Sequence, residues 1–266
     1  MVADLHEVEA AAREVLRVLG PGYSEAVYEE ALAHEFRLRE VAYERQRNFE
    51  ILYKGYKVGD GRADFIINPL WAGKSGRELV VELKAVKTIT EPHKRQAQVY
   101  LVSLNIAAGA VVSFADDILV EPVAKPTRRP QRQVVKPKRG RARVTTTLLK
   151  TAATEVFRYF GQEFVYREDT KKLFPDALAV ELRLRGLRFS TNTYPVLYKG
   201  HEVESHAFHL TFVDGSVADV SFYRKPEQVD ETLEELASLV RLFELKRGYA
   251  VLLPENDEGR VMVKPV

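Results

Sequence analysis

Apolar residues recur along this chain with two periods, one typical of helices and one typical of strands. Helical spacing covers residues 4–19 and stops at Gly20-Pro21-Gly22. Ser24 is a predicted N-cap for a second helix that reaches about Arg39. Strand, strand, strand, helix and strand patterns follow at residues 45–53, 57–67, 78–83, 92–104 and 108–113. This order, α-α-β-β-β-α-β, predicts an α/β (α+β mixed) sandwich, with a mixed central sheet flanked by helices.

Segments of the first half resemble segments of the second half in the same order. The matching pairs are residues 14–20 and 155–161, 30–39 and 176–185, 51–55 and 196–200, and 109–112 and 248–251. Shared sequence at several points in one order indicates a tandem duplication. The predicted domains are therefore residues 1–121 and 147–266, each with the same sandwich architecture.

The segment between the predicted domains is basic and rich in proline. Four prolines between residues 122 and 137 disfavour a helix or a central strand, so residues 122–146 are predicted to form an extended linker. No acidic residue lies between Glu121 and Glu155, so this segment is strongly basic. Because the whole chain has a net charge of only +2, the remaining, folded parts are acidic. The linker is either merely solvated or an arm that binds phosphates. Its candidate phosphate-binding residues are Arg128, Arg129, Arg132, Lys138, Arg139 and Arg141.

Composition excludes several kinds of site. The chain of 266 residues has no cysteine, which excludes disulfides and thiolate-bound metals. Its apolar runs are too short to cross a bilayer, and its acidic N-terminal segment is unlike a secretory signal. We expect a cytoplasmic protein that does not bind membranes.

Charged residues interrupt an apolar strand pattern in the first half. In Leu79-Val-Val-Glu-Leu-Lys84, alternation puts Glu82 and Lys84 on one face. An ion pair would explain these two residues without any catalytic role. Asp64, at the end of the preceding strand pattern, adds a second acid to that face. Two carboxylates beside a lysine suit Mg²⁺ or Mn²⁺, which can activate water for attack on a phosphate.

The motif Gly22-Tyr-Ser-Glu-Ala-Val-Tyr28 resembles the signature of the GxxExxY family, assigned to the PD-(D/E)xK nuclease superfamily. The resemblance continues through residues 30–35, 53–55, 62–64, 81–85 and 96–101, and so covers almost all of residues 5–115. It implies a restriction-endonuclease-like fold. Ala63 replaces the proline of the superfamily motif, and Leu16 and Val99 depart from common family residues.

By this resemblance, Asp64 and Glu82 are metal ligands, Glu25 supplies a further acid, and Lys84 is the catalytic lysine. Tyr28, Gln96 and Tyr100 are accessory residues of the cleft. Gln96 and Tyr100 lie four apart on a predicted helix and share a face. Tyr28 has the alternative of packing its helix against the sheet, and Gln96 that of lying on the surface.

The second copy lacks this set. Alignment puts Lys171 at the position of Glu25, Phe174 at that of Tyr28, His209 at that of Asp64, Asp219 at that of Glu82 and Ser221 at that of Lys84. The second copy is therefore predicted to be a pseudo-nuclease domain. A metal cluster of His201, His206, His209 and Asp219 is disfavoured, because the spacing matches no standard ligand motif.

The sequence thus predicts a Mg²⁺-dependent nuclease with one active site, acting on nucleic acid and favouring DNA over RNA. With one site, we expect nicking or trimming rather than a double-strand cut in one step. The expected assembly is a monomer acting as an internal pseudo-dimer, or a homodimer. The alternative is a non-catalytic module with the same pseudo-dimeric fold, which binds nucleic acid or protein.

Overall fold

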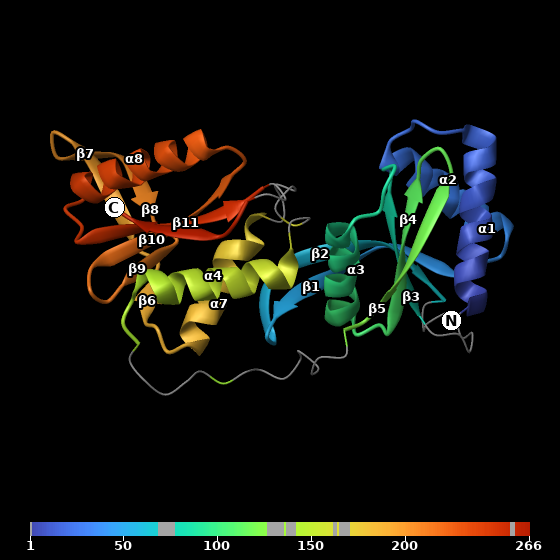
Figure 1. Cartoon of the computed structure of the whole chain (residues 1–266), viewed down its shortest axis with the longest axis horizontal. Coiled ribbons are helices and arrows are strands. Elements are labelled where there is room, and N and C mark those ends of the chain that lie inside the picture. The colour runs from blue at the N-terminus through green and yellow to red at the C-terminus, as the bar shows by residue number, and fades with distance from the viewer. Residues whose placement is uncertain are drawn as a thin grey trace. The chain divides into compact units, whose positions relative to one another are not determined.

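The computed structural model describes residues 2–68, 78–126, 136, 142–161, 164, 171–255 and 259–266, with side chains from Leu5 onwards. Two compact units divide the chain, Met1–Gln133 and Val134–Val266. Both are mixed α/β units in which helices cover a mixed sheet (Figure 1). No helix in the described ranges is long and apolar enough to span a bilayer.

The first unit has the predicted order with one added strand. Its elements are α1 (Val2–Leu19), α2 (Glu25–Leu38), β1 (Tyr43–Tyr53), β2 (Tyr56–Ile67), β3 (Leu79–Lys84), α3 (Glu91–Leu104), β4 (Ala108–Phe114) and β5 (Ile118–Ala124). The hairpin turn at Lys54-Gly55 has φ values of 51° and 88° at its two central residues. Positive φ at both central positions is typical of the tight hairpin turn that matches strand twist.

The sheet of the first unit runs in the order β1-β2-β3-β4-β5. Only β3 and β4 pair in parallel, through the crossover helix α3, and the other neighbours are antiparallel. The sequence pattern did not predict β5, because the repeated prolines from Pro122 onwards were assigned to an extended linker. Pro122 lies in β5 at the edge of the sheet, where a residue without an N–H is tolerated.

The two faces of this sheet have different partners. Phe65, Val81, Leu83, Ala110 and Val112 pack with α1 and α2 in one buried core. The alternate residues face α3, which packs on the opposite side in Figure 1. Glu82 pairs with Val111 and Lys84 with Ser113, so both charged side chains of β3 lie on the α3 face.

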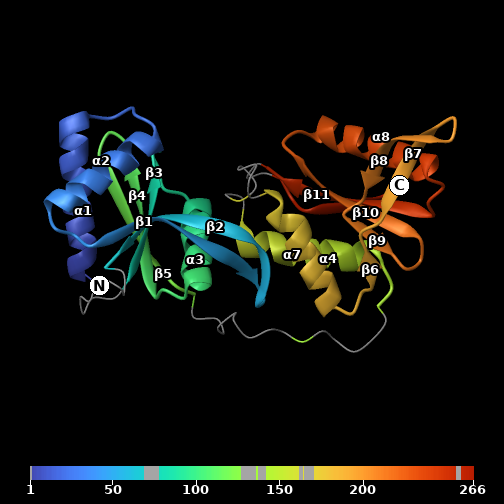
Figure 2. The same cartoon turned by 180° about the vertical axis from the view of Figure 1, so that it is seen from behind.

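The second unit has a related element order. Its helices are α4 (Thr146–Phe160), α7 (Leu173–Leu184) and α8 (Pro226–Leu242). Its strands are β6 (Phe189–Ser190), β7 (Thr193–Tyr198), β8 (His201–Ala207), β9 (Leu210–Phe212), β10 (Ser216–Tyr223), β11 (Arg247–Pro254) and β12 (Met262–Pro265). The main sheet runs β12-β11-β10-β9-β6, and β7 and β8 form a separate hairpin. Figure 2 shows α8 on one side of β10 and β11, with α4 and α7 on the other.

Gly109 lets α3 approach the sheet of the first unit. A Cβ at this position would lie 2.6 Å from the carbonyl oxygen of Val80 and 3.2 Å from a methyl of Leu101. At Gly248 in β11, the nearest atoms to an added Cβ are instead side-chain methyls of Val240 and Val266, both at 2.8 Å. A backbone oxygen can move less than the end of a side chain, so the two glycines differ in tolerance.

Gly109→Ala is therefore expected to destabilise the protein by about 2–4 kcal/mol, through overpacking against a fixed backbone atom. Gly248→Ala should cost less, because Val240 and Val266 can shift. Urea unfolding of both variants measures the difference in free energy. Equal losses in the two variants would contradict this explanation.

Candidate active site

Lys84 and Glu82 form a buried ion pair on β3. The distance from Lys84 Nζ to Glu82 Oε1 is 3.1 Å, and the two residues are 6% and 2% exposed. The pair runs along one strand, because residues two apart in a strand share a face. The ion pair offered as a non-catalytic explanation therefore exists. Burying two charges in one place is costly even when they are paired, so the pair by itself is weak evidence for a role in stability.

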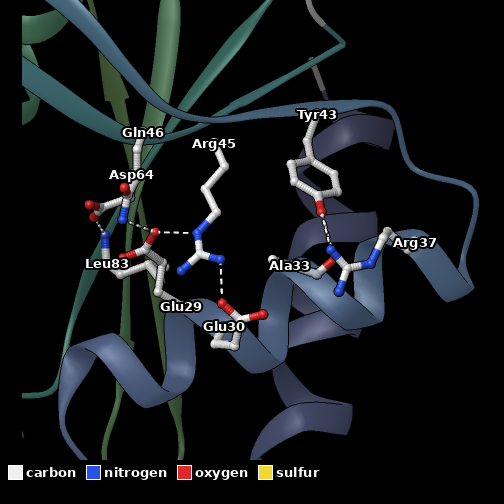
Figure 3. A network of polar contacts seen from close by, with 9 residues as sticks. All are labelled: Glu29, Glu30, Ala33, Arg37, Tyr43, Arg45, Gln46, Asp64 and Leu83. Atoms are coloured by element: carbon white, nitrogen blue, oxygen red, sulfur yellow. Dashed lines mark hydrogen bonds and ion pairs between the residues drawn. The ribbon is translucent and has the colours of Figure 1, made fainter.

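Asp64 lies where β2 separates from β3. The two strands pair from Phe65 with Val81 to Ile67 with Leu79. Continuing that register puts Asp64 opposite Glu82. Here the Asp64 side chain replaces a strand carbonyl, and its Oδ2 accepts a hydrogen bond of 2.8 Å from the Leu83 N–H (Figure 3). Since Phe65 faces the helical core, alternation puts Asp64 on the same face as Glu82 and Lys84.

The pKa of the Asp64 carboxyl is strongly raised in this cluster. Burial, together with the negative charge of Glu82, raises its pKa from 3.8 to about 8. The Leu83 hydrogen bond and the Lys84 ammonium act in the opposite direction, and Glu25 adds a further upward influence on the pKa. Burial is the main cause of the raised pKa of Asp64, and the two neighbouring carboxylates add to it. Perturbed acids of this kind cluster at functional sites.

This donor set fits a divalent cation. Carboxylate oxygens are the ligands that Mg²⁺ and Mn²⁺ prefer, and an added positive charge would relieve the repulsion between Asp64 and Glu82. Among the residues that the structure describes, no three His, Asp or Glu side chains converge closely enough to hold an ion. Mg²⁺ usually keeps several waters and takes one or two carboxylates, so Asp64 and Glu82 meet its minimum requirement.

Gln96 and Tyr100 share a face of α3, as their spacing predicted. Gln96 Nε2 donates to Tyr100 Oη at 3.0 Å, and both side chains are buried. The alternative that Gln96 lies on the surface is therefore wrong, because it is 1% exposed. Its buried Oε1 accepts no hydrogen bond from the described part of the chain. Tyr100 is fixed from the other side by Phe49 of β1, with ring centroids 4.9 Å apart.

Tyr28 lies in the core between α2 and the sheet. Its ring stacks on Phe114 with centroids 4.4 Å apart, and its hydroxyl donates to the Gly20 carbonyl at 2.9 Å. The same hydroxyl accepts a hydrogen bond of 3.2 Å from the Tyr23 N–H. Tyr28 thus holds the loop that precedes Glu25, which supports the alternative that it packs its helix against the sheet.

Three polar residues beside Asp64 were not predicted from the sequence. Figure 3 shows Gln46 and Arg45 of β1 meeting Glu29 of α2 next to Asp64. Gln46 Nε2 and Arg45 Nε donate to the same Glu29 oxygen, at 2.9 and 2.6 Å. Glu29 follows Glu25 by one helical turn, which was the available signal, but nothing in the sequence identified its partners.

The six basic linker residues named as phosphate ligands lie outside the described residues.

The second unit brings other residues together at the corresponding strands. The register of β9 and β10 puts His209 opposite Asp219, as Asp64 is opposite Glu82. Asp219 Oδ1 lies 2.8 Å from His209 Nδ1, and its Oδ2 lies 3.8 Å from His206 Nε2. These side chains, all within the described ranges, form no group that could hold a metal ion.

A family model described as the PD-(D/E)XK nuclease superfamily matches residues 3–125. Residues 3–125 form a PD-(D/E)XK nuclease superfamily domain. The matched range contains Glu25, Asp64, Glu82 and Lys84, and it ends just after β5. Nucleases of this superfamily generally use divalent metal ions and act on nucleic acid.

Among solved structures, the crystal structure of SSO0001 is similar to part of the chain. The two are 24% identical over 38% of this chain, with a TM-score of 0.30. The chain spans about half of the SSO0001 chain, with 50% of that chain covered. No curated protein matches this chain.

Proposed function

We propose that the PD-(D/E)XK domain is a Mg²⁺-dependent nuclease that hydrolyses phosphodiester bonds, in DNA rather than RNA, through a single active site. One observation carries the proposal: the partly buried Asp64 and the buried Glu82 and Lys84 are gathered in an acid-rich cluster on one sheet face. Burial and the charge of Glu82 raise the pKa of Asp64 to about 8, and a cation bound beside this carboxyl would favour its ionised form.

In this proposal Asp64 and Glu82 hold the ion, and Glu25 supplies a further acid from the first turn of α2. When bound, the ion supplies Lewis acidity and lowers the pKa of a coordinated water. Lys84 Nζ lies 3.1 Å from Glu82 Oε1, so it can orient that carboxylate and donate to an oxygen at the reaction centre. The Leu83 N–H keeps Asp64 directed at β3. Gln96 and Tyr100 line the α3 side, and the buried Gln96 Oε1 is an available acceptor.

The test is cleavage of single- and double-stranded DNA and RNA by purified protein in Mg²⁺, Mn²⁺ or chelator. We expect cleavage of DNA that needs the divalent ion and stops in chelator. Salt-dependent binding to DNA without cleavage in either metal would refute the nuclease proposal and favour the non-catalytic binding module.

We further propose that the second unit is a degenerate copy without catalytic activity. In support, its register puts His209 and Asp219 opposite each other, and β10 has Ser221 where β3 has Lys84. Both hairpin turns also carry a Lys-Gly pair with the same backbone signs, Lys54-Gly55 and Lys199-Gly200.

His209→Ala and Asp219→Ala are therefore expected to leave the rate of DNA cleavage within about twofold of wild type, since neither side chain belongs to the proposed site. A supercoiled plasmid should give nicked circles before linear product. The assay follows both products over time. A hundredfold loss of cleavage in either variant, or linear product without a nicked stage from monomeric protein, would contradict a single active site.

A further inference from the structure

The backbone of Gln46 departs from strand geometry directly opposite Asp64. In the β1–β2 register, Arg45 pairs with Phe65 and Arg47 with Ala63, and Gln46 lies between them. Gln46 has a φ of 53°, in the left-handed region that residues with a Cβ rarely adopt. Such strained positions concentrate at functional sites when the surrounding structure holds them in place.

The unusual backbone changes where the Gln46 side chain points. Consecutive side chains of a regular strand project to opposite faces. Arg45 and Gln46 nevertheless donate to the same atom, Glu29 Oε1, at 2.6 and 2.9 Å (Figure 3). A regular strand would have directed Gln46 to the α3 face. The left-handed turn instead brings its amide to the helix α2.

Glu29 connects this contact to the proposed ion ligands. Glu29 is buried at 9% exposure and lies one helical turn after Glu25, so the two share a face of α2. Gln46 lies opposite Asp64 in the β1–β2 register and donates to Glu29, so the contact joins the strand position of Asp64 to the helix that carries Glu25. Whatever fixes Glu29 against β1 therefore also fixes the position from which Glu25 approaches.

The chemistry of an amide suits this place. Gln46 gives Glu29 an N–H donor without adding a charge beside Asp64 and Glu82. A lysine here would offset part of the negative charge that a cation should meet, and a glutamate would repel Glu29. Arg45 also pairs with Glu30 on the outer side of α2, so its charge is shared between two acids.

We propose that Gln46 is a positioning residue of the active site, which through Glu29 holds the first turn of α2 so that Glu25 faces the ion bound by Asp64 and Glu82. This inference rests on the proposed nuclease function. The residue acts through Glu29 and touches neither the ion nor the substrate.

The test compares Gln46→Asn with wild type. Asparagine tolerates a left-handed backbone but is one methylene shorter, so it cannot keep the contact with Glu29. Binding of Mn²⁺ to metal-free protein is measured by electron paramagnetic resonance, and the Mg²⁺ dependence of DNA cleavage is measured separately. We expect the Mn²⁺ Kd and the half-saturating Mg²⁺ concentration to rise about tenfold. The rate at saturating Mg²⁺ and the melting temperature should change little.

Lys199→Gly is the matched control, since Lys199 has a similar φ of 51° in the second unit and should not alter Mn²⁺ binding. Gln46→Gly separates the amide from the backbone: it relieves the strain yet should weaken Mn²⁺ binding as Asn does. Unchanged Mn²⁺ affinity in both Gln46 variants would overturn this inference and leave the nuclease proposal standing. Absence of both Mn²⁺ binding and metal-dependent cleavage in wild type would overturn the two together.

Discussion

Lys84→Met should reduce the rate of DNA cleavage by about 10²–10³-fold at saturating Mg²⁺, the size of effect seen when one preorganised donor is removed from a reaction centre. Methionine keeps most of the length and the apolar character of the lysine stem and removes the ammonium group. That group lies 3.1 Å from Glu82 Oε1, and its charge lowers the pKa of Asp64. The rate is measured on a labelled duplex under single-turnover conditions.

The same change should lower the melting temperature of the metal-free protein, because Glu82 then stays buried without its ammonium partner. Mg²⁺ should restore part of that loss, since it supplies positive charge at the same place. Lys87→Met is the matched control: Lys87 lies three residues further on, is 84% exposed in its side chain and pairs with the exposed Asp116. A Lys84→Met protein that cleaves at the wild-type rate would exclude Lys84 from catalysis.

Asp64→Asn is expected to abolish metal-dependent cleavage and, at the same time, to stabilise the metal-free protein above pH 8. The pKa of the Asp64 carboxyl is about 8 when folded, against 3.8 in a solvated chain. The folded state therefore binds the proton more tightly than the unfolded state. Stability from this group is present in full below the unfolded pKa of 3.8, falls as pH rises and is lost above about pH 8.

Asparagine removes this pH dependence and can still accept the Leu83 hydrogen bond through its amide oxygen. We expect a gain of roughly 1–3 kcal/mol in the free energy of unfolding at about pH 9 without metal. Urea denaturation of both proteins in chelator, from about pH 5 to pH 9, measures it. Asp60→Asn, on the exposed part of the same strand, is the control. The prediction fails when wild type and Asp64→Asn show the same pH dependence.

Much of the strand β3 could be predicted from the local sequence pattern. The period of two in residues 79–84 places Glu82 and Lys84 on one face, and the structure confirms a shared, buried pair. The helical spacing of Gln96 and Tyr100 likewise predicted a shared face, on which the structure adds a hydrogen bond between the two side chains. The family match over residues 3–125 agrees with the resemblance found in the motifs, at the level of the superfamily.

The residues that escaped prediction depend on geometry between distant segments. Gln46 looks like an ordinary polar strand residue, because neither its left-handed φ nor its contact with Glu29 has a local signature. The edge strand β5 was not predicted because Pro122 was weighed as a strand breaker, although an edge position tolerates it. In the second unit, the split of the second strand into β8 and β9 likewise follows from pairing with different partners.

The hydrogen bond between Asp64 and the Leu83 amide links the acid cluster to the pairing of β2 with β3. The strength of the hydrogen bond from the Leu83 N–H depends on the charge of Asp64, since a charged acceptor binds an amide more strongly than a neutral one. Loss of a proton from Asp64, or binding of an ion to its carboxylate, therefore changes the strength of this hydrogen bond between β2 and β3. The backbone amide resonance of Leu83 is consequently a built-in spectroscopic probe of what the acid cluster holds, readable without any added label.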